Sequence, residues 1–141
     1  MTLPKELETE PYRFNLFSLL RQLERETPGK PRIGDSSTLA EEVVALSQDP
    51  FLAFPAANIS CVSQTPHGVP RLHTRFLGMF GPQGALPLHV TEETYRWSQR
   101  DPSFARFVDI VSTRFLQLFY RAWADARPIG QAERPAEDRF F

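Results

Sequence analysis

The three histidines are the side chains of this sequence best suited to bind a metal ion. His67, His73 and His89 are expected in a loop, a strand and a loop edge, and they lack the short spacing of common zinc motifs. A metal site would require the fold to bring three separate rings together. We therefore predict no metal site and no cofactor, and keep as an alternative a small metal-dependent enzyme that uses these histidines.

The segment from Phe76 to His89 reads F-L-G-M-F-G-P-Q-G-A-L-P-L-H and is rich in glycine and proline. It resembles a phosphate-binding loop only in its glycines, because no Gly-Lys-Ser or Gly-Lys-Thr follows. Glycine permits backbone angles closed to other residues and proline fixes φ, so each predicts a defined bend. Because large apolar side chains lie between the bends, we expect Phe80 and Leu86 to fasten this segment to the core or to a partner. The residues predicted to shape this architectural loop are Gly78, Phe80, Gly81, Pro82, Gly84, Leu86 and Pro87.

The remaining reactive side chains do not form a catalytic pattern. Glu92 and Glu93 are adjacent, so on a helix they point about 100° apart and cannot face each other as an acid and base pair. Ser60 and Ser63 lack the context of a nucleophile elbow. Cys61 is the single cysteine, which excludes an internal disulfide, suits a reducing cytoplasm and predicts a small buried apolar residue. We predict no catalytic residues.

Length and composition are those of a single globular domain. The 141 residues are 41% hydrophobic and 23% charged, and 16 basic against 17 acidic side chains give a net charge of -1. Basic residues are scattered among acidic ones, so no phosphate-binding stripe is present. No run of about 18 apolar residues occurs. The sequence therefore predicts neither nucleic-acid binding nor direct membrane insertion.

The first half of the chain predicts a helix and a small antiparallel sheet. Apolar residues recur at helical spacing from Arg13 to Glu26, and Pro28 and Gly29 end that helix. A short strand is possible within Glu41–Gln48. Ile59–Ser63 and Leu72–Leu77 are predicted as antiparallel partners. In the second of these, alternation places Leu72, Thr74 and Phe76 on a core face and Arg71, His73 and Arg75 on a face that contacts solvent or a partner.

The second half predicts two helices. Thr91 is expected to cap the first, which ends near Gln99, and Asp101 with Pro102 marks the start of the second. From Phe104 to Ala126, 15 of 23 residues are apolar, more than the three or four per seven that one buried face needs. A seam with steps of four and three runs through Phe104, Val108, Val111, Phe115, Leu118 and Ala122. We therefore expect part of this helix to contact another chain, with these candidate partner-interface or core anchors: Phe107, Phe115, Phe119, Tyr120 and Trp123.

Together these elements predict an α+β fold: an N-terminal helix, a small antiparallel sheet, the glycine- and proline-shaped loop, and two helices of which the last is long and strongly apolar. Residues 1–12 are predicted to form an arm, 13–128 a single domain, and 129–141 a tail. The tail has the features of the start of a further helix that is cut off by truncation.

Several blocks together resemble the N-terminal part of the TssG family (also called ImpH or VasB), a baseplate subunit of bacterial type VI secretion. The similar blocks are Phe14–Arg25, Gln48–Pro50, Leu52–Ala57, Gly78–Pro82, Leu86–His89, Phe107–Ile110, Arg114, Leu118–Trp123, Glu133–Arg134 and Asp138–Phe140. The resemblance covers nearly all of the chain beyond Glu10, although members of the family are more than twice as long.

The resemblance implies a noncatalytic scaffold subunit in the wedge of a cytoplasmic baseplate that docks near the inner membrane. In this family, TssG associates with two copies of TssF, and its loops connect to trimers of TssK. A TssF-like subunit is thus the first expected partner, and a TssK-like subunit is expected through regions outside this fragment. A self-associating structural module unrelated to secretion remains a further alternative.

Overall fold

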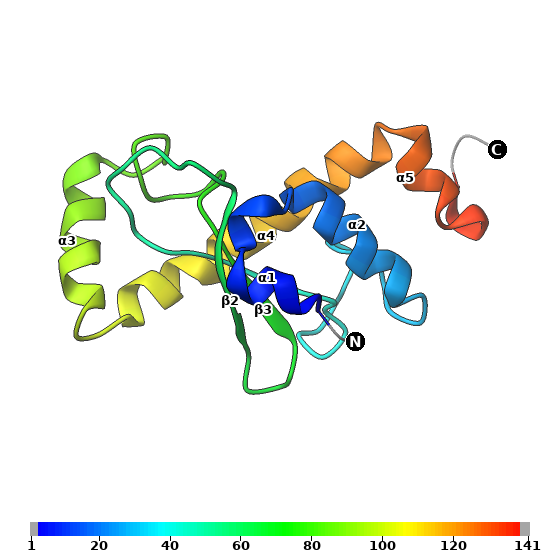
Figure 1. Cartoon of the computed structure of the whole chain (residues 1–141), viewed down its shortest axis with the longest axis horizontal. Helices are drawn as coiled ribbons and strands as arrows, with labels where there is room; N and C mark the ends of the chain where they lie inside the picture. Colours follow the sequence, from blue (N-terminus) through cyan, green and yellow to red (C-terminus); the bar gives the residue numbers. More distant parts are fainter. Residues whose placement is uncertain (1–2, 139–141) are drawn as a thin grey trace.

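The computed structural model describes residues 3–138 and confirms the α+β fold. In this range the chain forms five α-helices, two short 3-10 helices and a three-stranded sheet (Figure 1). The elements in chain order are α1 (Lys5–Thr9), η1 (Pro11–Arg13), α2 (Leu16–Glu26), β1 (Ala45–Gln48), β2 (Ile59–Gln64), β3 (Pro70–Thr74), α3 (Leu88–Ser98), α4 (Ser103–Asp125), α5 (Pro128–Ala132) and η2 (Pro135–Glu137).

The sheet has the order β1-β3-β2 and is mixed. The hairpin of β2 and β3 is antiparallel as predicted, with Val62 opposite Leu72 and a register shift between Ile59 and Cys61. β1 pairs parallel to β3, with Leu46 opposite Leu72, so the prediction of a purely antiparallel sheet is wrong. β2, which follows β1 and precedes β3 in the sequence, runs in the opposite direction to both, so β1 and β3 run in the same direction.

β3 is the central strand, and both of its faces are covered. Leu72 and Thr74 lie in the core as expected, but His73 is also buried, with 5% of its surface exposed. The predicted solvent-facing side of this strand is therefore closed at His73, while Arg75 is exposed. Phe76 lies beyond the end of the strand and packs edge-on against Phe17, with ring centroids 5.6 Å apart.

The N-terminal part is more structured than predicted. Helix α1 forms where the sequence indicated an arm, and its Leu7 is fully buried in the core. Helix α2 begins at Leu16, later than the predicted Arg13, because the Asn15 side chain accepts hydrogen bonds from the backbone N–H groups of Phe17 (3.0 Å) and Ser18 (3.2 Å). Its buried side supplies Leu16, Leu19, Leu20 and Leu23 to the core.

Two apolar clusters hold the elements together. The larger contains the leucines of α2, apolar residues of the sheet, and Leu116, Tyr120 and Ala124 of α4. The smaller joins Phe80 to Ala105 and Val108 of α4, with Met79 and Leu86 packed against it. Phe80 and Leu86 therefore pack the architectural loop against α4.

The two long helices after this loop differ in how well the sequence predicted their starts. Helix α3 begins at Leu88 directly after Pro87, so the predicted Thr91 cap is wrong, and Thr91 is buried one turn further along. Helix α4 begins at Ser103, whose backbone N–H donates to Asp101 Oδ1 at 2.9 Å, as the Asp-Pro signal indicated. α4 runs across the molecule from α3 at one end to α5 at the other (Figure 1).

The segment after α4 folds back onto the rest of the chain. Gly130 and Gln131 of α5 are buried, and Pro135–Glu137 form the 3-10 helix η2 in the segment where the sequence predicted the start of a further helix. Arg134 donates hydrogen bonds to the backbone carbonyls of Glu24 (3.2 Å) and Thr27 (3.3 Å) at the end of α2. Arg134 thus connects this segment to the end of α2, and Phe140 and Phe141 of the predicted tail lie outside the described residues.

Candidate protein-interaction surface

Helix α4 exposes several large apolar side chains on one side, with exposed Arg114 among them. Phe107 is 64% exposed, Ile110 73% and Phe115 61%, although such side chains are normally buried. Steps of three and four residues place side chains on the same side of a helix. We call this surface the α4 apolar face; it comprises Phe104, Phe107, Ile110, Val111, Phe115, Leu118 and Phe119.

The opposite side of α4 is buried although it is rich in polar groups. Its buried residues are Ala105, Val108, Asp109, Ser112, Leu116, Gln117, Tyr120, Arg121 and Ala124. Of the predicted seam, Val108 is buried, whereas Val111, Phe115 and Leu118 face outward. An ordinary amphipathic helix has one apolar stripe, which faces the core. α4 differs because it buries a side of mixed apolar and polar residues and exposes a second apolar stripe.

The outer edge of β1 explains why polar groups of α4 point inward. An edge strand has backbone groups that need partners. Asp109 Oδ1 accepts from Gln48 N at 2.9 Å, and the Thr113 hydroxyl donates to Leu46 O. Asp109 Oδ2 also accepts from Ser47 Oγ at 2.5 Å. The polar side of α4 therefore completes the sheet edge, and this arrangement leaves the apolar side outside.

The five predicted anchors divide between the core and this surface. Tyr120 is buried, and Trp123 is half-buried and stacks on Phe17 with ring centroids 4.7 Å apart. Phe107 and Phe115 are exposed. Phe119 is intermediate between the buried and the exposed anchors. Its ring centroid lies 5.8 Å from that of Phe76, yet the side chain remains 43% exposed.

The architectural loop is held by Gln48 at the end of β1. The Gln48 side chain accepts a hydrogen bond from Phe80 N and donates one to Phe80 O. A Cβ at Gly78 would lie 2.6 Å from Gln48 Cδ, and one at Gly81 would lie 2.6 Å from Phe51 Cζ. Gly81 also has φ +92 and its N–H donates to Thr91 Oγ1 at 3.2 Å. Gly78 and Gly81 are thus required because Gln48 and Phe51 leave no room for a Cβ atom. The sequence predicted only that these glycines mark bends.

The other loop residues have simpler positions. A Cβ at Gly84 would lie 2.5 Å from the carbonyl oxygen of Met79. Pro82 is exposed, Leu86 N donates to Met79 O at 2.9 Å, and Pro87 precedes the first residue of α3.

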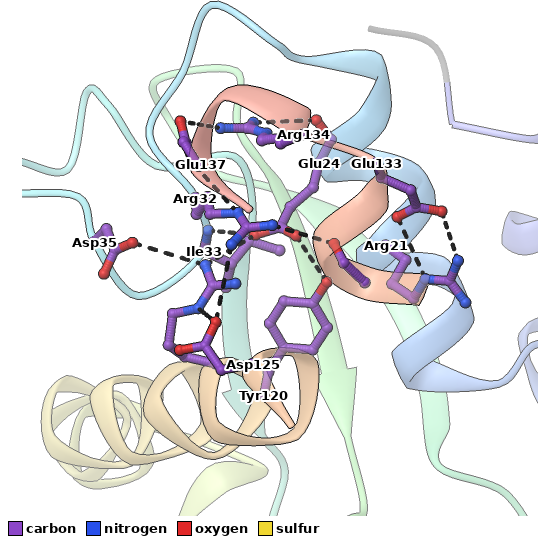
Figure 2. A network of polar contacts seen from close by, with 12 residues as sticks. Arg21, Glu24, Arg32, Ile33, Asp35, Tyr120, Asp125, Glu133, Arg134 and Glu137 are labelled. Carbon is purple, nitrogen blue, oxygen red and sulfur yellow. Dashed lines mark hydrogen bonds and ion pairs between the residues drawn. The ribbon is translucent and has the colours of Figure 1, made fainter. Parts of the chain in front are cut away.

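A network of buried and partly exposed charges connects the C-terminal segment and α4 to α2 (Figure 2). The Glu24 carboxylate accepts hydrogen bonds from Ile33 N (2.8 Å) and from the Tyr120 hydroxyl (2.9 Å). Arg121 Nη1 lies 3.6 Å from Glu24 Oε1, and Arg121 Nε lies 3.3 Å from Asp125 Oδ1. Arg21 Nη2 lies 2.5 Å from Glu133 Oε1. Burial and the charge of Glu24 raise the pKa of Tyr120. These contacts stabilise the fold that presents the α4 apolar face.

The structure does not bring the three histidines together. His67 is exposed in the turn between β2 and β3, His89 is exposed on α3, and His73 is buried on β3. Among residues 3–138, the set of three potential ligands whose atoms lie within 4.8 Å of one another is instead Asp49, Cys61 and His73. Sequence reasoning missed Asp49 and Cys61, since only strand register makes them neighbours of His73.

The His73 ring is held from two sides. Its Nδ1 lies 3.0 Å from Asp49 Oδ1, and its Nε2 lies 2.8 Å from Ser63 Oγ. Burial alone would raise the pKa of Asp49, but the His73 hydrogen bond and the charges of His73, Arg106 and Arg75 lower it below the usual value. Cys61 is exposed rather than buried as predicted. Partial shielding from solvent and the charge of Asp49 raise the pKa of its thiol.

The two adjacent glutamates have different surroundings. Glu92 pairs with Arg96 at 2.5 Å along α3, whereas Glu93 is exposed. Ser63 lies on a regular strand instead of the sharp turn that presents a nucleophilic serine.

An α+β domain that exposes a row of large apolar side chains has the surface of a subunit in a larger assembly. A family model described as Type VI secretion, TssG matches residues 10–141, so the chain belongs to the TssG family and is a type VI secretion component. No curated protein and no solved structure matches the chain significantly. Within the described range, no helix combines the length and apolar character needed to cross a membrane.

Proposed function

We propose that this chain is a noncatalytic scaffold subunit of the type VI secretion baseplate wedge, and that its α4 apolar face binds a TssF-like subunit. The observation that supports the proposal is the second, exposed apolar stripe of α4. Three large apolar side chains, Phe107, Ile110 and Phe115, are more than 60% exposed, while polar groups of the same helix are buried.

The physical argument is the cost of leaving this face in water. Burying a side chain such as Phe or Ile stabilises a complex by about 1.5–3 kcal/mol before the entropy of association is subtracted. Aromatic residues surrounded by other apolar groups are typical anchors of protein interfaces. The buried side of α4 is fixed by Tyr120, Asp109 and Thr113, so the face is presented on a rigid element.

Membership of the TssG family supports the proposed location and a second partner. We place the chain in a baseplate on the cytoplasmic side, docked near the inner membrane. A TssK-like subunit is the second partner that we propose, and none of the surfaces described above is assigned to it.

Binding can be tested with a TssF-type subunit from the same secretion system. We expect the two chains to co-elute in size-exclusion chromatography at micromolar concentration. Phe107→Asp and Phe115→Asp should abolish co-elution, because each places a charge at the centre of an apolar contact. Both side chains are exposed in the isolated chain, so the melting temperature of each variant should remain close to that of the wild type.

The matched control is Gln83→Asp, which adds the same charge at an exposed position of the architectural loop. This variant should bind as the wild type does. Separate elution of the wild-type chains would remove the support for a TssF-like partner. A stable homo-oligomer that is dispersed by Phe115→Asp would instead assign the α4 apolar face to a second copy of this chain.

A further inference from the structure

The ligand set of Asp49, Cys61 and His73 joins two parts of the chain that the sequence keeps apart. Asp49 directly follows β1, whereas Cys61 and His73 lie opposite each other on β2 and β3. A carboxylate oxygen, a thiol sulfur and a ring nitrogen of these residues lie within 4.8 Å of one another.

We propose that Asp49, Cys61 and His73 form a binding site for a thiophilic divalent cation, with Zn²⁺ as the ion that fits best. Thiolate sulfur, imidazole nitrogen and carboxylate oxygen are the donors that Zn²⁺ takes in proteins. Three protein ligands leave a fourth tetrahedral position, which water can occupy because Cys61 is exposed and Asp49 is 37% exposed. This inference is independent of the proposed scaffold function.

His73 is arranged so that one ring nitrogen can bind the ion while the other is held. Nδ1 faces Asp49 at 3.0 Å, and an ion bound there would replace the hydrogen bond between these two atoms. The ring proton then resides on Nε2 and is donated to Ser63 Oγ, which lies 2.8 Å away. A hydroxyl can either donate or accept, so Ser63 remains bonded in both states. A second hydrogen bond of this kind orients most metal-binding histidines.

Charge and protons balance in the bound state. The Asp49 carboxylate and the Cys61 thiolate together carry two negative charges, which match the charge of the ion. Starting from the neutral ring of His73, the ring keeps its single proton, which lies on Nε2 in the bound state. One proton, that of the Cys61 thiol, leaves to solvent when the sulfur binds.

The same residues invite comparison with a Ser-His-Asp relay, in which Ser63 would be the nucleophile. Two observations favour the metal site. Ser63 lies within strand β2 and not on a strained turn. The relay also has no role for Cys61, whose sulfur belongs to the same cluster.

The test uses the purified full chain, treated with a chelator and then titrated with Co²⁺ or Zn²⁺ alone. We expect one equivalent of Co²⁺ to bind with a thiolate-to-cobalt charge-transfer band, and Zn²⁺ to displace it and to raise the melting temperature. Cys61→Ser should lose the band, and Asp49→Asn should bind more weakly. Ser63→Ala should lose about tenfold or more in affinity through its contact with His73.

His89→Asn is the matched control, because this exposed histidine lies outside the cluster, and its titration should equal that of the wild type. Cys61 is exposed, so Cys61→Ser is expected to fold and can be checked by its metal-free melting temperature. Absence of binding at micromolar Zn²⁺, or binding that survives Cys61→Ser, would overturn the proposal. Covalent labelling of Ser63 by a fluorophosphonate without metal binding would overturn it in favour of the relay.

Discussion

The side-chain amide of Gln48 binds the backbone of Phe80 with both of its polar groups. Gln48 Oε1 accepts from Phe80 N at 2.9 Å, and Gln48 Nε2 donates to Phe80 O at 3.1 Å. Because the backbone N–H of Gln48 donates to Asp109, this one residue connects β1, the architectural loop and α4. The loop that leads to α3 is therefore positioned by the last residue of a strand.

Gln48→Ala is expected to destabilise the domain. It would leave the backbone N–H and C=O of Phe80 buried without these partners, at about 1–3 kcal/mol for each unsatisfied group. Urea unfolding should show a lower midpoint, and proteolysis should cut the chain within 76–87 earlier than in the wild type. Gln83→Ala, at an exposed position of the same loop, should leave both properties unchanged. Equal midpoints for Gln48→Ala and the wild type would show that the amide contact does not hold the loop.

Gly81→Ala should also destabilise the domain, by a steric route. Alanine is strained at φ +92, and its Cβ would lie 2.6 Å from Phe51 Cζ. Left-handed backbone costs an alanine about 1–2 kcal/mol, and overpacking adds about 1–3 kcal/mol. Thermal unfolding measures the sum.

The control for this change is Gly29→Ala, because a Cβ at Gly29 would meet no atom of the described residues within 4 Å. That variant should unfold near the wild-type temperature. If Gly81→Ala were as stable as Gly29→Ala, the placement of Gly81 against the Phe51 ring would be wrong.

Local signals in the sequence predicted the elements better than their arrangement. The Asp101-Pro102 start and the helical spacing after it gave α4 to within one residue, and strand character on both sides of a turn gave the β2–β3 hairpin. The possible strand within Glu41–Gln48 is β1, but its parallel pairing with β3 was not predicted, since alternation along a strand carries no information on the direction of its neighbour.

The candidate sites show the same limit. The apolar count of α4 correctly indicated a helix with more apolar surface than one core needs, but two apolar stripes were present. Which stripe faces outward is decided by the edge of β1, whose backbone groups bind Asp109 and Thr113. Asp49 and His73 meet only because β1 pairs with β3, so no spacing rule could find that cluster.

Neighbouring residues on α4 provide a direct test of its orientation. Phe115 is 61% exposed and Leu116 is buried in the main cluster. Leu116→Ala should lower the free energy of unfolding by about 2–5 kcal/mol, because it leaves a cavity. Phe115→Ala should change it by no more than about 0.5 kcal/mol in the isolated chain. Urea unfolding of both variants gives the comparison, and a reversed order would mean that α4 packs through its apolar face.

Tyr120 should make the domain sensitive to alkaline pH. Burial and the Glu24 carboxylate raise the pKa of its hydroxyl above the ordinary value of 10.0. The folded chain thus keeps a proton that the unfolded chain loses, so the contribution of Tyr120 to stability is complete below pH 10.0 and declines above it. The slope for one such group is about 1.4 kcal/mol per pH unit. Unfolding free energies measured from neutral pH to above this value should show the decline.

Tyr120→Phe isolates this contribution from that of other groups. It removes the hydrogen bond to Glu24, so it should be less stable than the wild type near neutral pH by about 1 kcal/mol. Its stability should fall less steeply at alkaline pH, and the difference between the two proteins should shrink or reverse. Tyr95→Phe, which changes an exposed tyrosine on α3, should follow the wild-type curve. Parallel curves for Tyr120→Phe and the wild type would mean that the Tyr120 hydroxyl ionises equally in the folded and unfolded chains, and that its burial against Glu24 is wrong.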